Sequence, residues 1–306
     1  MNLNQRIVVD GNDGTGKSTL VHTLRCLGFT EVLDRGEMSK ATLDPKVGPA
    51  PGTVYILLVC DWRESKRRLI QAGKDMTEIW HTDEALQRFD ADFRRLAPIF
   101  NAKVVESHHR DDTVLDVVTH LGAQVRLGAP SGRLVGKSPL AWPFDQPPTG
   151  RTLTAHCGPI QAVWTRTRSY PQMVALGSLD TAVVGSDVLE GNPYAAQVSV
   201  VHRVPQTGRE GVPLRVVIAS KTGTIPQTPL LRVITPFPEW AAVYFGERGT
   251  PHTVFSVGGG SEGILAGGIG DVLFDTVETG DTLRANGLQV VEEVAKLDTC
   301  IIVRKT

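Results

Sequence analysis

The sequence predicts an α/β protein built from two domains. Apolar segments typical of buried strands alternate with helical segments along the 306 residues, an order that favours parallel sheets covered by helices. Near each end of the chain, one apolar segment runs into a loop suited to phosphate. Between them lies a Pro-rich stretch, residues 139–150, preceded by a fresh strand at 124–127. We therefore place the boundary near Gly122, with domains of residues 1–122 and 123–306.

The N-terminal domain is predicted to open with a strand at residues 6–10, the sequence GNDGTGKS and a helix at 19–27. This satisfies G-x-x-x-x-G-K-[ST] in the strand–loop–helix context that a P-loop needs. Loop amides would face the phosphates of ATP, Lys17 would reach the β- and γ-phosphates, and the Ser18 hydroxyl would bind Mg²⁺. The alternative is a Gly-rich turn without a ligand. The predicted site residues are Gly11, Asp13, Gly14, Gly16, Lys17, Ser18 and Thr19.

The rest of this domain continues the pattern of a parallel sheet. A second strand at residues 29–33 ends in Asp34-Arg35, and residues 54–60 form a continuous apolar run, as in a strand buried on both faces. A basic helix is expected from Asp61. Apolar positions at helical spacing predict a core-facing helix over residues 83–97. A last strand is expected at residues 103–106.

The order GNDGTGKST … LDRGEMS resembles thymidylate kinases and related small nucleoside or nucleotide kinases. The resemblance implies that Asp34 and Arg35 orient the acceptor phosphate, and that arginines of residues 61–68 close over the phosphates. It also implies that adenine lies near the loop after the last strand. The alternative for Asp34 and Arg35 is a solvated ion pair, and the alternative for residues 61–68 is a solvated helix face. The acceptor-binding section is shorter than in those kinases, so the acceptor stays open.

The C-terminal domain is organised around residues 270–283, GDVLFDTVETGDTL. The apolar start predicts a buried strand. The acids Asp275 and Glu278 follow it and could accept hydrogen bonds from sugar hydroxyls or hold a cation. Gly280 tolerates positive φ, so the amides and threonine hydroxyls of residues 279–282 could form a nest for a phosphate. The alternative to this ribose-5-phosphate cradle is a strand followed by a polar turn.

Residues 270–288 resemble the phosphoribosyl-diphosphate loop of the ATP phosphoribosyltransferases that open histidine biosynthesis. The resemblance covers roughly residues 123–306, because further matching segments follow in the family's order. It implies two α/β lobes, like a periplasmic binding protein, with the active site between them, and assembly into dimers or larger homo-oligomers. The matching segments are SGRL at 131–134, RTL at 151–153, residues 177–189, TPFP at 235–238 and GSE at 260–262.

The chemistry implied is attack of an adenine ring nitrogen on C1 of phosphoribosyl diphosphate, with pyrophosphate leaving together with Mg²⁺. Such a reaction depends on positioning and charge neutralisation. The resemblance assigns the 5-phosphate to Thr279, Gly280, Asp281, Thr282 and Leu283, the ribose hydroxyls or Mg²⁺ to Asp275 and Glu278, the anionic substrates to Arg133 and Arg151, and a further binding position to Glu262.

Three departures from the family pattern leave the nucleobase acceptor open. Pro130 replaces a basic residue, and residues 167–169 replace an acidic run. The sequence also stops at Thr306, before the histidine-binding domain of the long form, so feedback by histidine is not expected in this chain alone.

Composition narrows the class of protein. Lys plus Arg number 32 against 33 Asp plus Glu. Proteins that work on nucleic acid usually show a basic excess, so no standing nucleic-acid partner is expected. No apolar run reaches the ~18 residues of a membrane span, and the N-terminus lacks a signal-peptide pattern. The four cysteines are scattered, as in a reduced cytoplasmic protein. We expect a cytoplasmic protein acting on small-molecule nucleotides.

The leading hypothesis is a fusion enzyme that transfers phosphoribose to ATP or a related purine nucleotide and carries an ATP-binding, kinase-like N-terminal domain. In the first alternative, only the kinase works and the C-terminal domain senses a ligand. In the second, both domains bind nucleotides without catalysis and regulate a partner. The intact Lys17-Ser18 pair and residues 279–282 argue against full loss of binding.

Overall fold

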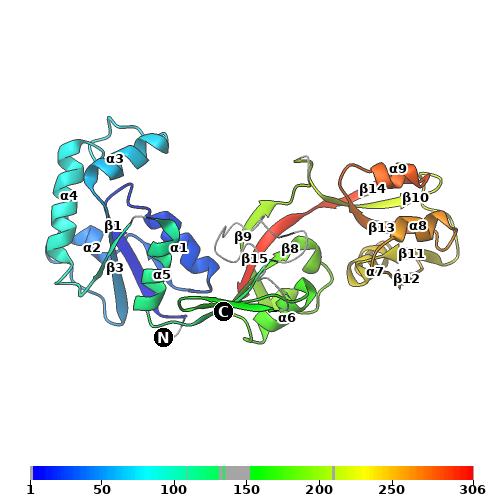
Figure 1. The fold of residues 1–306 in the computed structure, drawn as a ribbon, viewed down its shortest axis with the longest axis horizontal. Coiled ribbons are helices and arrows are strands. Elements are labelled where there is room, and N and C mark those ends of the chain that lie inside the picture. The colour runs from blue at the N-terminus through cyan, green and yellow to red at the C-terminus, as the bar shows by residue number, and fades with distance from the viewer. Residues whose placement is uncertain (1–2, 108, 131–133, 135–151, 209–210, 306) are drawn as a thin grey trace. The chain divides into compact units, whose positions relative to one another are not determined.

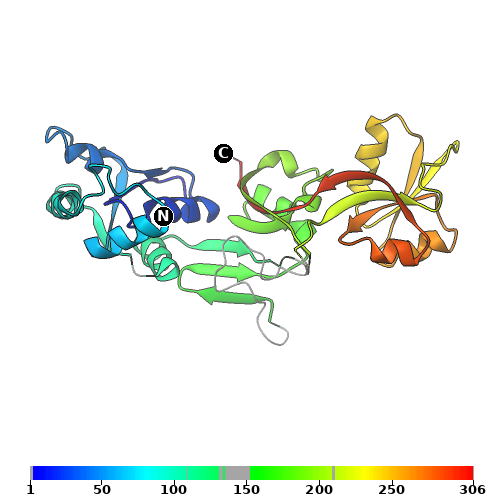
Figure 2. The ribbon, with the colours of Figure 1, turned by 90° about the horizontal axis from the view of Figure 1, so that it is seen from above.

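The computed structural model describes residues 3–107, 109–130, 134, 152–208 and 211–305. The chain divides into two compact units (Figures 1 and 2). The N-terminal unit comprises Met1–Leu127 with Pro148–Val163, and the C-terminal unit comprises Gly128–Pro147 with Trp164–Lys305. The predicted boundary near Gly122 separates domains that fold independently. A division into compact units does not test independent folding, so this boundary stays a prediction.

The N-terminal unit contains a parallel sheet with the strand order β2-β1-β3-β4. Its two central strands are apolar on both faces and buried, because helices cover both sides. Helices α2 and α4 pack on one face around Val8, Tyr55 and Leu57, and α1 and α5 lie on the other (Figure 1). The strands are β1 (Arg6–Gly11), β2 (Val32–Asp34), β3 (Thr53–Val59) and β4 (Lys103–Glu106).

Two helices of this unit, α3 and α4, begin at residues whose side chains cap them. Asp61 and Thr82 accept hydrogen bonds from backbone amides at the starts of α3 and α4. Of the predicted stripe Leu86, Phe89, Phe93 and Leu96, helix α4 buries all but Phe89, which packs half-buried against the same core. The helices are α1 (Lys17–Cys26), α2 (Glu37–Ala41), α3 (Trp62–Gln71), α4 (Asp83–Leu96) and α5 (Arg110–His120). Strand β5 (Val125–Gly128) follows, and β6 (Thr154–Cys157) and β7 (Ile160–Val163) form an antiparallel hairpin.

The first lobe of the C-terminal unit is built on β15, which lies between β8 and β9 and is antiparallel to both. Tyr170 is fully buried and donates a hydrogen bond to the carbonyl of Ala129 at 3.0 Å. The elements are β8 (Thr181–Gly185), β9 (Val198–Pro205), β15 (Asp298–Arg304), α6 (Tyr170–Ala175) and the 3₁₀ turns η2 (Thr167–Ser169), η3 (Ser186–Val188) and η4 (Ala195–Gln197).

The second lobe has a five-stranded mixed sheet with the order β12-β11-β13-β10-β14. Strands β11, β12 and β13 are parallel, and β10 runs antiparallel to β13 and β14. The elements are β10 (Arg215–Ser220), β11 (Leu231–Thr235), β12 (His252–Ser256), β13 (Val272–Val277), β14 (Gln289–Lys296), α7 (Pro238–Glu247), α8 (Ser261–Ala266) and α9 (Asp281–Ala285).

The chain passes between these two lobes twice, after β9 and after β14 (Figure 2). The crossing segments are hydrogen-bonded to each other. The amide of Gln206 donates to the carbonyl of Leu297, and the amide of Leu297 donates to the carbonyl of Leu214, both at 2.8 Å. The predicted two-lobed α/β arrangement is therefore observed, and two hydrogen-bonded crossing segments join the lobes.

Two predictions from composition can be compared with the structure. No helix among the described residues is long and apolar enough to cross a membrane. All four cysteines are free thiols, as predicted for a reduced protein, and burial raises the pKa of the Cys26 thiol to about 12. A thiol with so high a pKa is a packing group rather than a nucleophile.

Phe274 on β13 is the centre of the second lobe's core. Its ring lies 5.5 Å from those of Trp240 and Tyr244 and 6.3 Å from that of Phe245, measured between centroids. We expect Phe274→Ala to lower the free energy of unfolding by about 3–5 kcal/mol, because it leaves a cavity among these rings. Urea unfolding followed by tryptophan fluorescence measures this. The matched control is Phe255→Ala, at a side chain 46% exposed, and equal losses in both variants would contradict the assignment.

Candidate functional site

The first candidate site lies at the carboxyl ends of the parallel strands β11, β12 and β13, where open α/β sheets bind their ligands. A glycine-rich loop connects β12 to α8, and a second short loop connects β13 to α9. Each helix begins directly after a glycine with positive φ, 67° at Gly260 and 81° at Gly280. Only glycine adopts this backbone without strain, so the positive φ expected at Gly280 is present, and its role toward a phosphate stays a prediction.

Asp275, near the end of β13, ties the strand to the start of α8. Its carboxylate accepts a short hydrogen bond from the Ser261 hydroxyl and one from the Thr276 amide at 2.6 Å. Burial raises the pKa of Asp275, and the negative charge of Glu262 adds to that rise. The Ser261 hydroxyl also lies 3.3 Å from Glu262. The structure therefore brings together Asp275 and Glu262 and adds Ser261, which sequence reasoning did not single out.

The loop at residues 279–282 is shaped by its own side chains. The Thr279 hydroxyl donates to the Asp281 carboxylate at 2.5 Å. Arg284 forms a close ion pair with Asp281 and donates to the carbonyl of Thr279 at 3.2 Å. Hydrogen bonds from Thr279 and then Arg284 lower the pKa of Asp281. Because Arg284 neutralises Asp281, the exposed loop can receive an anion without repulsion from that carboxylate.

Arg284 was not predicted, although the signal was present. It follows Asp281 by three residues, the spacing at which two side chains on a helix meet.

Glu278 points toward the connection between the lobes rather than into the loop. A Cβ atom added at Gly208 would lie 1.9 Å from the Glu278 carboxyl carbon, so only glycine leaves room for this side chain. No group of three or more His, Cys, Asp or Glu side chains that could hold a metal occurs among the described residues. The roles of Glu278 and Asp275 toward ribose or Mg²⁺ stay predictions. Arg133 and Arg151 lie outside the described residues.

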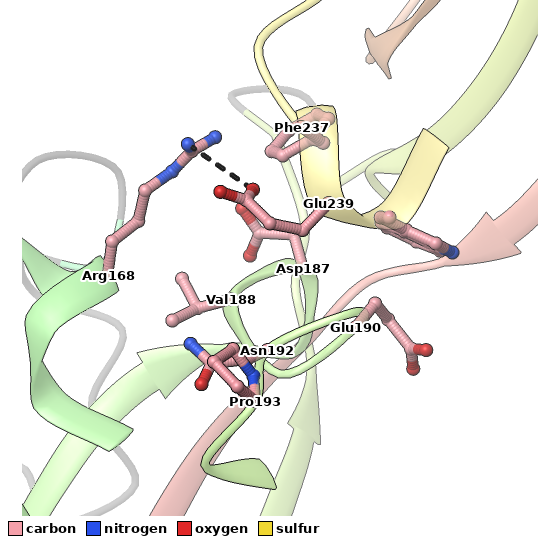
Figure 3. A pocket seen from close by; sticks show the side chains of 9 residues that line it. Arg168, Asp187, Val188, Glu190, Asn192, Pro193, Phe237 and Glu239 are labelled. Atoms are coloured by element: carbon pink, nitrogen blue, oxygen red, sulfur yellow. Dashed lines mark ion pairs between the residues drawn. The ribbon is translucent and has the colours of Figure 1, made fainter. Parts of the chain in front are cut away.

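A small cavity of about 90 Å³ lies between the two lobes of the C-terminal unit (Figure 3). The family-like segments at 177–189 and 235–238 both reach it. Arg168 of the first lobe approaches Glu239 of the second at 3.9 Å. A cavity of this size holds water rather than a nucleotide, since ligand pockets start at about 300 Å³. It is lined by Arg168, Asp187, Val188, Glu190, Asn192, Pro193, Phe237, Glu239 and Trp240.

The second candidate site is the loop between β1 and α1 in the N-terminal unit. Lys17 is only 5% exposed and donates to the Asn12 carbonyl at 2.6 Å, across the loop. The Asn12 side chain in turn donates to the carbonyl of Leu86 at 2.6 Å, which fixes the loop to α4. Gly14 and Gly16 have φ values of 79° and 93°. The predicted strand–loop–helix is present, with its lysine lying over a cradle of backbone groups.

The surroundings of Ser18 can be compared with the predicted Mg²⁺ site. The Ser18 hydroxyl lies 2.5 Å from one carboxylate oxygen of Asp34. The other oxygen, Oδ1, is buried and has no hydrogen-bond partner among the described residues. A hydroxyl and carboxylate oxygens are ligands that Mg²⁺ prefers, and a buried oxygen without a partner is costly unless something satisfies it. Asp34 therefore lies beside Ser18, whereas its neighbour Arg35 turns to Asp13, and the role of Ser18 toward Mg²⁺ stays a prediction.

A cavity of about 400 Å³ lies on one side of this loop. Arg68 of α3 reaches across it to Ser107, donating to the hydroxyl at 3.0 Å and to the carbonyl at 2.8 Å. The basic helix and the loop after β4, which the kinase resemblance places around ATP, thus border one space. The lining side chains that bear charge are Glu64, Arg67, Arg68 and Arg110.

Comparison with known proteins identifies the second half of the chain. A family model described as "HisG: ATP phosphoribosyltransferase" matches residues 166–306. An ATP phosphoribosyltransferase of Symbiobacterium thermophilum is 33% identical over 171 residues, which cover 53% of this chain and 73% of the relative. The chain belongs to the ATP phosphoribosyltransferase family. ATP phosphoribosyltransferases use ATP and phosphoribosyl diphosphate, usually with Mg²⁺, which are the three cofactors predicted.

Other relatives extend this comparison. An ATP phosphoribosyltransferase of Gemmatimonas aurantiaca is 34% identical over 158 residues, and the chain spans only 53% of its length. A chain in the structure titled "ATP phosphoribosyl transferase (HisG:HisZ) complex from Thermotoga maritima" is 22% identical. The match has a TM-score of 0.49 and covers 59% of this chain and 88% of that one.

The buried Asp275 makes a prediction about pH. Its pKa is higher in the folded chain than in the unfolded one, so its contribution to stability is present below the unfolded value of about 3.9 and is lost as pH rises through the folded value. We expect Asp275→Asn, which keeps the shape of the side chain, to remove this loss. The gain in stability of Asp275→Asn over the wild type should therefore grow from about pH 4 toward neutrality.

Urea unfolding over a pH series measures this effect. Asp281→Asn is the control of opposite sign, because the pKa of Asp281 is lowered, so its contribution is present at higher pH and is lost as pH falls. A difference between Asp275→Asn and wild type that does not change with pH would refute the account of Asp275.

Proposed function

We propose that this chain transfers the phosphoribosyl group of phosphoribosyl diphosphate to ATP, the reaction that opens histidine biosynthesis. The observation that carries the proposal is the loop between β13 and α9, in a chain of this family. Asp281 and Thr282 are exposed beyond the carboxyl end of a buried strand, and Arg284 neutralises the acid of the loop. This arrangement suits the 5-phosphate of a ribose.

The other parts of the substrates are assigned to residues outside this loop. Asp275 lies six residues before Asp281 on the same strand–loop segment, where a carboxylate could accept hydrogen bonds from ribose hydroxyls or hold Mg²⁺. Arg133 and Arg151 are proposed to bind the anionic substrates. An adenine ring nitrogen then attacks C1 of the ribose as the bond from C1 to the pyrophosphate oxygen breaks. Catalysis would come from positioning and neutralisation of charge.

The acceptor is proposed to be ATP, with a related purine nucleotide as the alternative because of Pro130 and residues 167–169. Assembly into a homo-oligomer and a cytoplasmic location stay predictions that the family resemblance and composition make.

We infer a second function for the N-terminal unit, the binding of ATP for phosphoryl transfer. Two observations support it: Lys17 is buried over the loop, and the unpartnered oxygen of Asp34 lies beside Ser18. The triphosphate would lie along the loop with its nucleoside in the cavity next to Arg67 and Arg68. The resemblance to thymidylate kinases is the reason to expect transfer rather than binding alone.

Thr282→Val tests the first proposal, because it removes an exposed hydroxyl at little change in volume. A hydrogen bond to a charged group contributes about 1.5–3 kcal/mol, so we expect kcat/KM for phosphoribosyl diphosphate to fall by about tenfold to a hundredfold. Pyrophosphate release measures it. Thr250→Val, at the opposite ends of the strands, is the matched control. Equal activity in Thr282→Val and wild type would remove the loop from the site.

Lys17→Ala tests whether the two functions are separate. We expect phosphoryl transfer to fall by about a hundredfold or more, because the lysine would contact only the phosphates of the N-terminal nucleotide. Phosphoribosyl transfer should stay within about twofold of wild type, which is the usual scatter for independent sites. Lys103→Ala, on an exposed position of β4, is the control. If Lys17→Ala silences both reactions while the chain stays folded, there is one composite site.

A further inference from the structure

Ser261 is a buried serine on the inner face of helix α8. It is 1% exposed, and its hydroxyl faces Asp275 of strand β13. Leu265, four residues later, is equally buried and packs in the core of the second lobe with Ile234 and Leu273. Side chains four residues apart share one face of a helix, so the packing of Leu265 also turns Ser261 toward β13. The core thereby fixes the position of this hydroxyl.

An apolar side chain would suit this buried face better than a hydroxyl if packing were the only requirement. Burying a hydroxyl costs free energy unless it is hydrogen-bonded. Ser261 donates to Oδ2 of the Asp275 carboxylate and lies 3.3 Å from Oε2 of Glu262. A hydroxyl has a single hydrogen to donate, and the shorter contact shows that Asp275 receives it. The serine therefore serves the Asp275 carboxylate.

The carboxylate of Asp275 is held at both of its oxygens. Oδ1 accepts from the amide of Thr276 at 2.6 Å and from the hydroxyl of the same residue at 3.3 Å, and Oδ2 accepts from Ser261. The last torsion of an aspartate side chain has a broad energy minimum, so contacts from outside must fix the plane of the carboxylate. Thr276 alone would hold one end of it, and Ser261 adds the second.

These contacts leave Asp275 one position for a ligand. A carboxylate has about four lone-pair sites. In the part of the chain that the structure describes, Thr276 takes two sites on Oδ1 and Ser261 takes one on Oδ2. The remaining site is on Oδ2 of a half-buried side chain. Asp275 can therefore accept one further hydrogen bond, and the direction of that bond depends on Ser261.

We propose that Ser261 is a positioning residue for phosphoribosyl transfer, which orients the carboxylate of Asp275 toward a ribose hydroxyl. The proposal rests on the proposed function, in which Asp275 accepts hydrogen bonds from the ribose. Ser261 contacts the carboxylate rather than the substrate, because its side chain is buried between α8 and β13. Its effect on the reaction therefore passes through Asp275.

Ser261→Ala tests the proposal in the full chain, with pyrophosphate release from phosphoribosyl diphosphate and ATP in the presence of Mg²⁺ as the assay. We expect kcat/KM for phosphoribosyl diphosphate to fall by about tenfold or more, because a misplacement of about 1 Å can cost about a hundredfold. Ser261→Thr keeps a hydroxyl and should retain more activity than Ser261→Ala. Equal losses in the two folded variants would overturn the proposal.

The matched control is Ser220→Ala. Ser220 is also 1% exposed, and its hydroxyl donates to the carbonyl of Thr224 at 2.8 Å. It follows Ala219 of β10, which pairs with Leu273 near the start of β13, so it lies away from the loops at the carboxyl ends of the parallel strands. Ser220→Ala removes one buried hydrogen bond and should leave kcat/KM within about twofold of wild type. A loss of activity as large as that of Ser261→Ala would overturn the proposal.

A double-mutant cycle separates positioning from a general structural effect. If Ser261 acts through the carboxylate, Ser261→Ala should change kcat/KM by less than about twofold once Asp275→Asn has removed the charge. Losses that add in the double variant would mean that the serine acts independently of Asp275, which would contradict the role proposed for it.

The positioning role and the proposed function fail in different ways. A folded wild type that neither binds phosphoribosyl diphosphate in calorimetry nor releases pyrophosphate would overturn the proposed function and the role of Ser261 with it. An active wild type whose kcat/KM is unchanged in Ser261→Ala would overturn the role of Ser261 alone.

Discussion

A phosphate bound by backbone amides requires a chain that turns sharply and leaves those amides unpaired, and in this protein glycines with positive φ meet that requirement. Gly16 precedes α1, Gly260 precedes α8 and Gly280 precedes α9, with φ of 93°, 67° and 81°. A residue with a Cβ atom in this conformation costs about 1–2 kcal/mol. The positions of Lys17, Ser261 and Thr279 all follow from these turns, so both candidate sites depend on them.

The negative charges of the acidic residues around the two loops are balanced in different ways. Asp13 is paired with Arg35 and Lys17, and Asp281 with Arg284, so neither repels an incoming phosphate. Among the described residues, Asp275 forms no ion pair with a cation; burial raises its pKa, and the Ser261 hydroxyl with the amide and hydroxyl of Thr276 stabilises its charge. A carboxylate kept at this cost to stability is expected where its charge serves a ligand, since folding alone would favour a neutral side chain there.

The parts of the structure that could be predicted are those that depend on residues close together in the sequence. The continuous apolar run of β3, the stripe of α4 and the glycines of both loops are local signals, and the structure contains each of them. Ser261 was not predicted, because what matters about it is its proximity to Asp275 in the fold. Sequence spacing gives no such distances. The position of Asp34 beside Ser18 likewise depends on how β2 pairs with β1.

The two lobes of the C-terminal unit are joined in a way that suits closure around a substrate. Among the described residues, their crossing segments form few backbone hydrogen bonds, through Gln206, Leu214 and Leu297. The ion pair of Arg168 with Glu239 joins side chains that are 50% and 59% exposed, at 3.9 Å, and exposed pairs contribute about 0–1 kcal/mol. The binding free energy of a ligand that contacts both lobes easily exceeds a contribution this small. Since a ligand shifts an equilibrium by its difference in affinity for the two states, phosphoribosyl diphosphate held by the second lobe and a nucleotide contacting the first would together determine how far the lobes close.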